Sequence, residues 1–433
     1  MSLIAIGFLS IAAMLLLVGL GIPIAMAMAV VGIAGLSWFG SFDQAAFQLT
    51  TIAWETGTDF LFITAPMFIL MGQLVYRADL AGDLYDCLQK WLGWLPGGLA
   101  IASVMACAMF AAITGVSAAT VVTMGQMAMP EMRKRNYDPA LSTGALAIAG
   151  TLGILIPPSI LMVLFGIWTE TSIGDLFIAG IVPGVLMTLG FALLILVRCL
   201  INPALGPVGP RFSWGDRFRS LVKLLPVFVV FGFVMGGIYG GVFTPTEASG
   251  FGAISVFLVG FAMRRFTWKK LGDALYSTVR TSGMIFLIIV GGSLLARFLA
   301  VTEISQAIVD VVMGTDRSVL VVLISLTLMY IVLGAILDVF GMLILTLPFV
   351  FPVVISLGIN PVWFGVYLVI VTEIALVTPP VGINTFVMHS VARDVPLATI
   401  FRGVTPFVGV AVALLALMIA FPDVVLWLPG LNQ

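Results

Sequence analysis

Two proline pairs in strongly apolar stretches are the first residues of this chain that could do chemistry. Pro157-Pro158 ends the run TLGILIPP, and Pro379-Pro380 ends the run TEIALVTPP 222 positions later. Proline has no backbone N–H and its ring clashes with the preceding helical turn, so each pair should break a helix and free carbonyl oxygens. Inside a bilayer, free carbonyls are tolerated only where they face protein or a water-filled cavity. Two breaks in matched positions predict a duplicated ion or substrate site, in preference to a kink that only shapes packing.

The oxygen atoms around the breaks suit a small hard cation such as sodium, which transporters bind through unwound carbonyls and hydroxyls. At each break, the missing N–H groups free the two carbonyls one turn earlier, and unwinding would turn further backbone oxygens inward. The predicted sodium ligands at the breaks are Gly153, Ile154, Ile156, Pro158, Ala375, Leu376, Thr378 and Gly382.

The segment TGVSAAT, residues 114–120, is small and polar in the middle of an apolar stretch. Gly115 allows a tight turn, after which Ser117 and Thr120 begin a helix whose free N–H groups suit a carboxylate. Small residues here could instead serve close helix packing. We predict substrate contacts from Gly115, Ser117 and Thr120, and sodium contacts from Thr114 and Ser117.

Two polar residues that follow the breaks, Ser159 and Asn384, complete the predicted substrate site. Asn384 has both a donor and an acceptor and should face the tips of the hairpins. A hydrogen bond between helices is an equally open role for it.

Acidic residues in the second half are candidate functional residues, because placing an ionisable group at membrane depth costs free energy. Asp338, in the segment GAILDVFG, either helps to hold a cation, which we favour, or caps the next helix. Glu373 lies just before the second break, and whether it has a functional or only a structural role is likewise left open. Glu247 in TPTEASG is predicted to be structural, because Thr244, Pro245 and Glu247 together make a capping box.

The composition identifies a membrane protein. The chain has 433 residues, of which 61% are hydrophobic and 9% charged, whereas a soluble domain has about 25% charged residues. Three scattered cysteines and one histidine, His389, support neither a disulfide framework nor a zinc site. Catalysis with a histidine base is also disfavoured, so we expect no enzyme. Six tryptophans are expected as anchors at the membrane borders: Trp38, Trp54, Trp91, Trp94, Trp168 and Trp363.

The proline pairs belong to a longer internal repeat. At the same shift of 222, Gly19 matches Gly241 and Pro23 matches Pro245. The first repeat covers residues 1–200, a linker covers 201–221, and the second repeat covers 222–433. Short arms around a polar middle predict re-entrant hairpins at 96–130 and 318–352, and the proline pairs predict broken helices at 139–169 and 361–390. Further spans are expected near 3–20, 22–39, 60–76 and 177–197, and near 224–240, 245–262, 274–296 and 400–420.

This order of segments predicts the fold class and its orientation. We expect an all-α polytopic membrane protein with two repeats, each with five spanning helices, one of them broken, and a re-entrant hairpin. Because five crossings is an odd number, the second repeat must enter the membrane from the opposite face, so the topology is inverted. Most Lys and Arg residues then fall on one set of loops, which places the linker in the cytoplasm and both termini in the periplasm.

Four motifs in this order, ITGVSAATVVTMG, GTLGILIPPSI, FTPTEASG and ALVTPPVGIN, resemble the large membrane subunit of tripartite ATP-independent periplasmic (TRAP) transporters. The similarity covers essentially the whole chain. The resemblance implies an elevator-type symporter of the bacterial inner membrane that takes up an organic acid, such as a dicarboxylate, sialic acid or a related sugar acid. It implies sodium as the coupling ion, with two or more ions per cycle. The implied partners are a small four-helix membrane subunit and a periplasmic substrate-binding protein.

The family motifs fall on residues 114–120 for the hairpin, 153–159 for the first break and 378–384 for the second. The hairpin of the family commonly reads TGSS, whereas Val116 replaces the first serine here, which leaves only a backbone carbonyl as a ligand at that position. The alternative within transport is a stand-alone carboxylate carrier of related fold, coupled to sodium or to protons through Asp338 or Glu373. A channel or an intramembrane aspartyl enzyme is less favoured.

Overall fold

A computed structural model describes residues 2–115, 117–314 and 318–431 of the chain. Every regular element in these ranges is a helix, and no strand occurs among the residues so described. Eight of the helical segments are long and apolar enough to cross a membrane by length and composition. They are Phe60–Arg77, Pro139–Thr169, Ile173–Ile201, Trp214–Tyr239, Pro245–Ala262, Trp268–Val301, Val339–Ser356 and Leu397–Ala420. The all-helical, polytopic fold class predicted from the sequence is confirmed.

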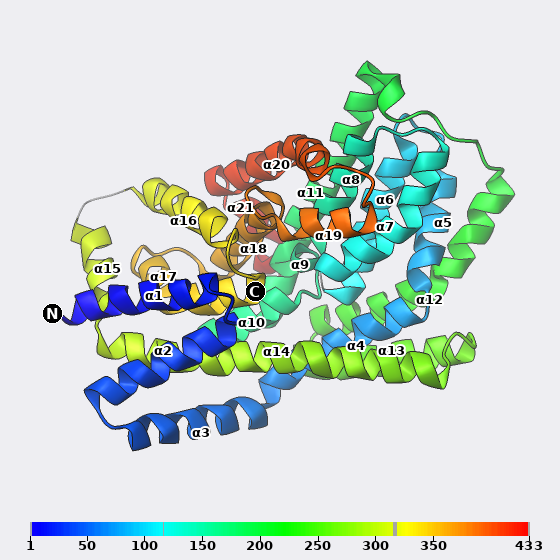
Figure 1. Ribbon diagram of the computed structural model, residues 1–433. Coiled ribbons are helices and arrows are strands. Elements are labelled where there is room, and N and C mark those ends of the chain that lie inside the picture. The colour runs from blue at the N-terminus through cyan, green and yellow to red at the C-terminus, as the bar shows by residue number, and fades with distance from the viewer. Residues whose placement is uncertain (1, 116, 315–317, 432–433) are drawn as a thin grey trace.

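The helices follow in the same order in the two halves (Figure 1). The first half contains α1 (Leu3–Gly19), α2 (Ile24–Phe39), α3 (Phe42–Thr58), α4 (Thr64–Arg77), α5 (Leu80–Leu92), α6 (Gly98–Thr114), α7 (Ser117–Lys134), α8 (Pro139–Ala149), α9 (Leu152–Leu155), α10 (Ile160–Thr169) and α11 (Ile173–Ile201). The second contains α12 (Trp214–Tyr239), α13 (Pro245–Ala262), α14 (Trp268–Val301), α15 (Ile304–Gly314), α16 (Val319–Leu333), α17 (Val339–Ser356), α18 (Pro361–Val377), α19 (Ile383–Val391), α20 (Leu397–Ala420) and α21 (Asp423–Gly430). Of two short 3₁₀ helices, η1 (Phe60–Ile63) precedes α4 in the first half, and η2 (Pro203–Leu205) lies in the linker between α11 and α12.

The repeat of 222 positions is visible in the points at which helices begin. Helices α7 and α8 begin at Ser117 and Pro139, and their counterparts α17 and α18 begin at Val339 and Pro361, in each case 222 positions later. The boundaries of the two repeats, 1–200 and 222–433, stay a prediction. The opposite orientation of the two repeats in a membrane stays a prediction.

One pair of counterparts differs between the halves. Helix α14 is continuous over 34 residues, whereas the matching stretch of the first half is divided into α3, η1 and α4. The division occurs at Asp59, whose carboxylate accepts a hydrogen bond from the backbone N–H of Leu61 at 2.8 Å and so starts a new helical turn. The sequence prediction named no helix at α3, α5, α15 or α21. Helix α3 has exposed aromatic residues such as Phe47 and Trp54 and mixes them with polar ones, so it did not read as a membrane span.

Local sequence explains most helix ends. The capping box predicted at the start of α13 is confirmed, since the Thr244 side chain and the Glu247 side chain each bond the backbone of the other residue. Asp138 caps α8 at Leu141, with Pro139 in the first turn. The predicted hairpin at 96–130 corresponds to α6 and α7, and the one at 318–352 to α16 and α17.

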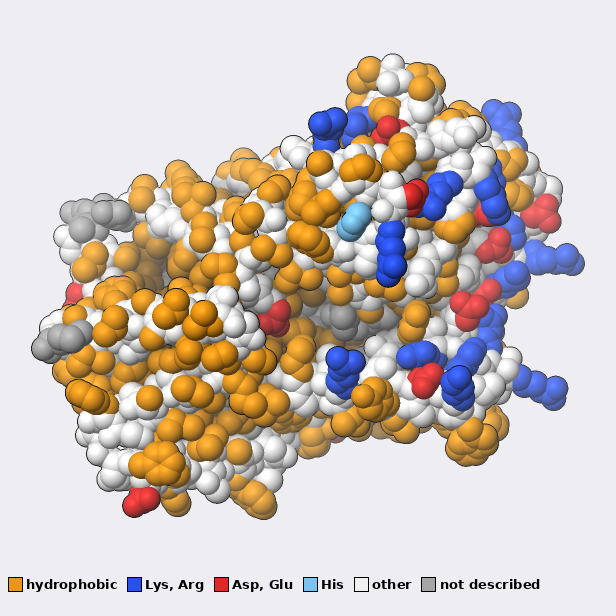
Figure 2. Space-filling view, viewed as in Figure 1, with side chains coloured by type: hydrophobic (Ala, Val, Ile, Leu, Met, Phe, Trp, Pro, Cys, Tyr) orange, Lys and Arg blue, Asp and Glu red, His pale blue; other side chains and the backbone are white. Residues whose placement is uncertain are grey.

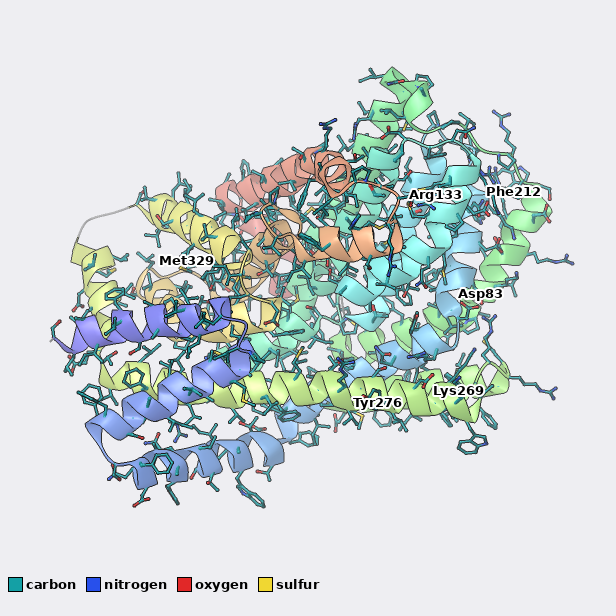
Figure 3. The ribbon with its side chains drawn as sticks, viewed as in Figure 1. Asp83, Arg133, Phe212, Lys269, Tyr276 and Met329 are labelled. Carbon is teal, nitrogen blue, oxygen red and sulfur yellow. The ribbon has the colours of Figure 1, made fainter. Side chains whose placement is uncertain are left out.

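Charged side chains gather at one end of the molecule (Figure 2). Asp83, Arg133 and Lys269 lie toward this end (Figure 3), and Arg265 pairs there with Asp83 at 2.7 Å. The opposite half of this face is mainly hydrophobic. Such an asymmetry is typical of a membrane protein with one positively charged side.

The six tryptophans predicted as anchors differ in exposure, and Trp91 and Trp168 are half-buried. Trp38, Trp54 and Trp94 are exposed, as expected for anchors at a membrane border. The prediction is wrong for Trp363, which is 4% exposed. Its indole N–H donates to the carbonyl of Met418, so it packs α18 against α20.

Candidate functional site

The tip of the first hairpin is closed by Gly115. Helix α6 ends at Thr114, Gly115 has a φ of +62°, and α7 begins at Ser117. This left-handed backbone favours glycine, as the TGVSAAT pattern had indicated. The Thr114 hydroxyl donates to Phe110 O at 3.2 Å and lies 3.4 Å from the Thr120 hydroxyl. Val116, where the family motif has a serine, lies outside the described residues.

The tip of the first hairpin packs directly against the first break. Helix α9 ends at Leu155, Ile156 is extended, and the bond between Pro157 and Pro158 is cis. A Cβ placed on Gly115 would lie 2.9 Å from the Pro158 carbonyl oxygen, so only glycine allows this approach. The Pro158 oxygen, a predicted cation ligand, therefore faces the tip of the first hairpin.

Ser159, at the first break, caps a helix and bonds the carbonyl of Ile154. The Ser159 hydroxyl donates to Ile154 O at 2.6 Å and accepts from Met162 N at 3.3 Å, so it caps α10. The sequence predicted that the Ile154 carbonyl would be free. This prediction is wrong, because the Ser159 hydroxyl donates a hydrogen bond to that oxygen. Ser159 itself is fully buried.

The second break repeats this pattern with different residues. Thr378 donates from its N–H and its hydroxyl to Ile374 O, at 3.1 and 2.5 Å, and its N–H also approaches Ala375 O at 3.4 Å. Gly382, with a φ of +59°, precedes α19, and its carbonyl accepts hydrogen bonds from Thr385 N and Phe386 N. The prediction that the Gly382 oxygen turns toward a cation is therefore wrong, since that oxygen belongs to the first turn of α19.

The second hairpin meets the second break through Gly334. A Cβ on Gly334 would lie 2.5 Å from the Ala375 side chain, which places the end of α16 directly against α18. Asp338 caps α17, since its carboxylate accepts from Phe340 N at 3.3 Å. The structure thus shows the capping role, the less favoured of the two alternatives that the sequence left open. No hydrogen bond or ion pair within the described ranges joins Asp338 to the first hairpin.

Asn384 joins the second break to the tip of the first hairpin. Its amide nitrogen donates to the Ser117 hydroxyl at 2.6 Å and lies 3.5 Å from Ala147 O on α8. The expectation that Asn384 faces a hairpin tip is confirmed. Its amide oxygen is buried and has no hydrogen-bond partner among the described residues, so it is an available oxygen ligand next to Ser117.

Burial closes this site in the present conformation. Ser117 is 7% exposed, and Thr120 and Asn384 are at most 1% exposed. These residues and Pro158 come from three segments far apart in the sequence, which are the start of α7, the first break and the start of α19, and they meet at the tip of the first hairpin. The sequence analysis missed Thr385, whose hydroxyl lies 3.4 Å from Val377 O across the second break. Its position directly after Asn384 was the available signal.

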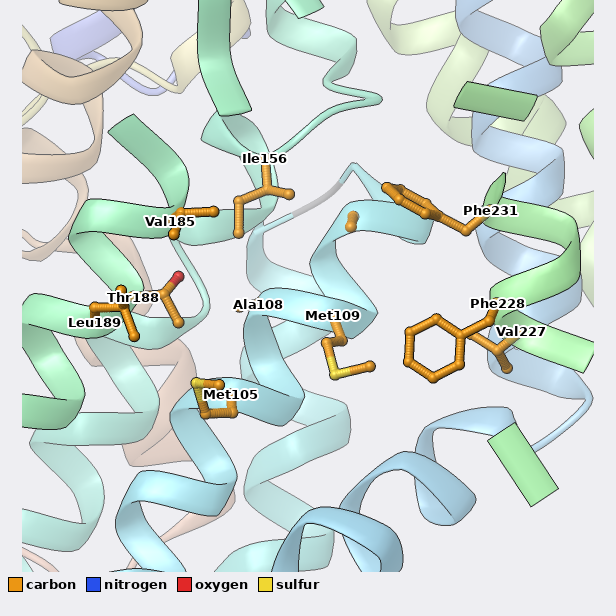
Figure 4. A pocket seen from close by; sticks show the side chains of 11 residues that line it. Met105, Ala108, Met109, Ile156, Val185, Thr188, Leu189, Val227, Phe228 and Phe231 are labelled. Carbon is orange, nitrogen blue, oxygen red and sulfur yellow. The ribbon is translucent and has the colours of Figure 1, made fainter. Parts of the chain in front are cut away.

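A nearby cavity does not have the chemistry of this site (Figure 4). It has a volume of about 260 Å³ and lies between α6, α11, α12 and Ile156. Apart from Thr188, its labelled side chains are apolar, including Met105, Phe228 and Phe231. A charged substrate or cation would find no adequate partner in it, so the polar cluster around Ser117 remains the candidate site.

The comparisons with known proteins agree with the predicted resemblance. A model of the DctM component of tripartite ATP-independent periplasmic transporters matches residues 11–424. The C4-dicarboxylate TRAP transporter large permease protein DctM of Vibrio cholerae is 33% identical, over 95% of this chain and 94% of the relative. The ectoine TRAP transporter large permease protein TeaC of Halomonas elongata is 31% identical, over 97% and 98% of the two chains.

Among solved structures, the YdaH transporter of Alcanivorax borkumensis has a similar fold. The TM-score is 0.63, and the match covers 89% of this chain and 90% of that one, at 14% sequence identity. This likeness concerns the fold alone. The match of the family model over nearly the whole chain, together with these relatives, shows that the protein belongs to the DctM family, the large permease components of TRAP transporters.

Proposed function

We propose that this permease carries an organic acid across the bacterial inner membrane together with sodium. The observation that carries the proposal is the cluster at the tip of the first hairpin, where the Ser117 hydroxyl, the Pro158 carbonyl and the free Asn384 amide oxygen converge. Neutral oxygens of this kind suit a dehydrated monovalent cation. The start of α7 beside them suits a carboxylate.

The substrate class is a carboxylate such as a dicarboxylate, sialic acid or a related sugar acid. Relatives named for C4-dicarboxylates and for sialic acid support this class. The proposed partners are a small four-helix membrane subunit and a periplasmic substrate-binding protein, and two or more sodium ions are proposed per cycle. Thr114, Gly153, Ile156 and Leu376 remain proposed sodium ligands, and Gly115 and Thr120 remain proposed substrate contacts.

The proposed mechanism is of the elevator type, in which the hairpins and broken helices move against a scaffold. Helices α2, α4, α13 and α14 pack closely along one side of the molecule and are the proposed scaffold (Figure 1).

Uptake into proteoliposomes tests the proposal. The permease is reconstituted with its small subunit, and the binding protein is added with a radiolabelled C4-dicarboxylate or sialic acid. Uptake should require an inward sodium gradient and should stop when choline replaces sodium. If a pH gradient alone drives uptake equally well, the proton-coupled carrier is the correct alternative.

A binding measurement separates sodium recognition from transport. A ligand that binds only the folded state raises its stability by RT ln(1 + [L]/Kd), about 2.7 kcal/mol at a hundredfold excess over Kd. Sodium should therefore raise the unfolding temperature of the purified permease relative to choline at equal ionic strength. An equal unfolding temperature in both salts would contradict a sodium site in this chain.

A further inference from the structure

A long groove opens on the outside of the molecule between α4, α13 and α14. It has a volume of about 690 Å³. Its lining is mainly apolar, with Leu70 and Leu74 from α4, Phe257 and Phe261 from α13, and Leu275 from α14. The last three of these side chains are exposed. None of the roles assigned above uses this groove.

Two helical glycines leave room along the groove. Gly250 on α13 and Gly272 on α14 both line it, and a Cβ at either position would meet no neighbouring atom within 4 Å. From Gly250 to Phe261, α13 rises about 17 Å, which is close to half of the roughly 30 Å hydrocarbon core of a bilayer. The groove therefore has the length of one leaflet and suits a single acyl chain.

Basic residues flank one end of the groove. Residues 266–268 line this end, and Arg264, Arg265, Lys269 and Lys270 stand directly before and after them in the sequence. They belong to the connection from α13 to α14 and to the first turn of α14. Lys269 lies at the charged end of the molecule (Figure 3). The apolar lining thus ends where the positive charge begins.

Two of these four cations are available to an anion. Arg265 is held by Asp83 at 2.7 Å, and the Lys270 side chain donates to Arg265 O at 3.1 Å. Arg264 and Lys269 are exposed, and neither forms an ion pair within the described ranges. An anion at this end of the groove would therefore meet two unpaired positive charges.

The start of α14 adds to this positive charge. The helix begins at Trp268, and the first N–H groups of a helix have no carbonyl partner within it. The Thr267 side chain caps one of them, the N–H of Lys270, at 3.3 Å. The acidic residue in the second turn, Asp273, is paired with Arg77 at 3.5 Å. A helix N-terminus with free N–H groups beside unpaired cations is an arrangement that binds a phosphate.

We propose that this groove is a binding site for an anionic phospholipid. Its phosphate lies between Arg264, Lys269 and the start of α14, and one acyl chain lies along α13 toward Gly250. Basic clusters at the ends of transmembrane helices recognise anionic head groups in this way. A helix of a partner protein would fill the apolar groove but would leave the two cations without an anion. The assignment depends neither on sodium coupling nor on the transported substrate.

Native mass spectrometry of the purified permease tests the head-group part of the site. Phosphatidylglycerol, which is anionic, and phosphatidylethanolamine, which is zwitterionic, are added separately, and the affinity of the first bound lipid is measured. Wild type should prefer phosphatidylglycerol. Each Lys or Arg near an anionic lipid contributes about fivefold in affinity, so a variant with both Arg264→Gln and Lys269→Gln should bind phosphatidylglycerol about thirtyfold more weakly.

A matched variant controls for net charge. Arg211 and Arg219 are also exposed and unpaired in the described parts of the chain, but they do not line the groove. Replacing both with glutamine makes the same change in charge and should leave the affinity for phosphatidylglycerol as in wild type.

Filling the groove tests the acyl-chain part of the site. Gly250→Leu places a side chain in the open groove and should weaken phosphatidylglycerol binding severalfold, while the helix tolerates the change because leucine is favoured over glycine. Gly283→Leu on α14 is the control, since a Cβ there also has no neighbour within 4 Å but Gly283 does not line the groove.

Three results would overturn the proposal. Wild type could bind the two lipids equally, or Gly250→Leu could bind phosphatidylglycerol as tightly as wild type. The third is that Gly250→Leu abolishes co-purification of the small membrane subunit and leaves lipid binding unchanged, which would make the groove a protein interface.

Discussion

The amide of Asn384 donates a hydrogen bond to the hydroxyl of Ser117 across 2.6 Å, although 267 positions separate them in the chain. Ser117 begins the second arm of the first hairpin, and Asn384 begins the helix after the second proline pair. The bond therefore joins the two repeats at the place where each interrupts a helix. It leaves one oxygen of Asn384 unpartnered beside the hydroxyl of Ser117, which gives the site its available ligand.

Replacing Ser117 with alanine should weaken transport without loss of the protein from the membrane. The change removes one hydrogen bond, which contributes about 0.5–1.5 kcal/mol, or about 1.5–3 kcal/mol if the partner is charged. We expect an apparent KM for substrate or sodium that is about threefold to a hundredfold higher, measured by uptake into proteoliposomes. Ser103→Ala is the control, because its hydroxyl bonds Leu99 O within α6 and Ser103 lies about three turns from the tip. Equal losses at both positions would indicate a folding defect instead of a site at the tip.

A double-mutant cycle between Ser117 and Asn384 should show strong coupling. Because the two residues share a hydrogen bond, either single change to alanine already removes it, so the double variant should cost less than the sum. We expect a coupling free energy of about 0.5–3 kcal/mol in the apparent sodium affinity, as is usual for residues in contact. Additive effects would show that the bond is absent in the state that binds sodium.

Gly72→Ala should disturb the tip of the first hairpin from the side of α4. A Cβ at this position would lie 2.8 Å from the Thr114 Cα and 2.9 Å from its carbonyl oxygen, so backbone must move. Overpacking of this kind typically costs about 1–3 kcal/mol. A thermal unfolding measurement should show reduced stability, together with slower uptake.

Gly232→Ala on α12 is the matched control for this change. It is also a helical glycine, but a Cβ there would have no neighbour within 4 Å. An alanine in a helix interior is favoured over glycine by up to about 1 kcal/mol, so this variant should unfold at the same or a higher temperature. If both variants behave alike, the contact between Gly72 and Thr114 has no role in positioning the hairpin.

The proposed orientation predicts where the linker after α11 is accessible. The three native cysteines, Cys87, Cys107 and Cys199, are buried. They should therefore react little with a thiol reagent. A cysteine at exposed Val208 should resist a membrane-impermeant thiol reagent in intact cells and react after lysis. A cysteine at Ser41, in the predicted periplasmic loop after α2, should react in intact cells. The reverse pattern would place the linker in the periplasm and overturn the topology.

Much of the fold could be predicted from the sequence, because its signals are local. The proline pairs interrupt helices wherever they occur, so both breaks were predictable. The glycine of the TGVSAAT segment and the capping box at Thr244 work in the same local way. The helices that were missed, α3, α5, α15 and α21, are the ones whose polar residues or short length do not resemble a membrane span.

The ligand set was harder to predict, because freed carbonyls compete for nearby donors. The Ile154 oxygen accepts the Ser159 hydroxyl, and the Gly382 oxygen accepts two N–H groups of α19. Asp338 likewise caps the next helix. Which oxygen stays free depends on the hydrogen bonds that each break forms in three dimensions, and no residue pattern specifies them by itself.

By itself, the sequence determined that this chain is a membrane protein of two matched halves, each with one hairpin and one broken helix, since composition and proline act through solvation and backbone geometry alone. Only the tertiary structure decided which atoms meet. The approach of Gly115 to the Pro158 carbonyl, the bond between Asn384 and Ser117, and the solitary burial of Glu373 all depend on how distant helices pack. Such contacts are decided by the close fit of whole helices in the interior, where a shift of one side chain moves its neighbours.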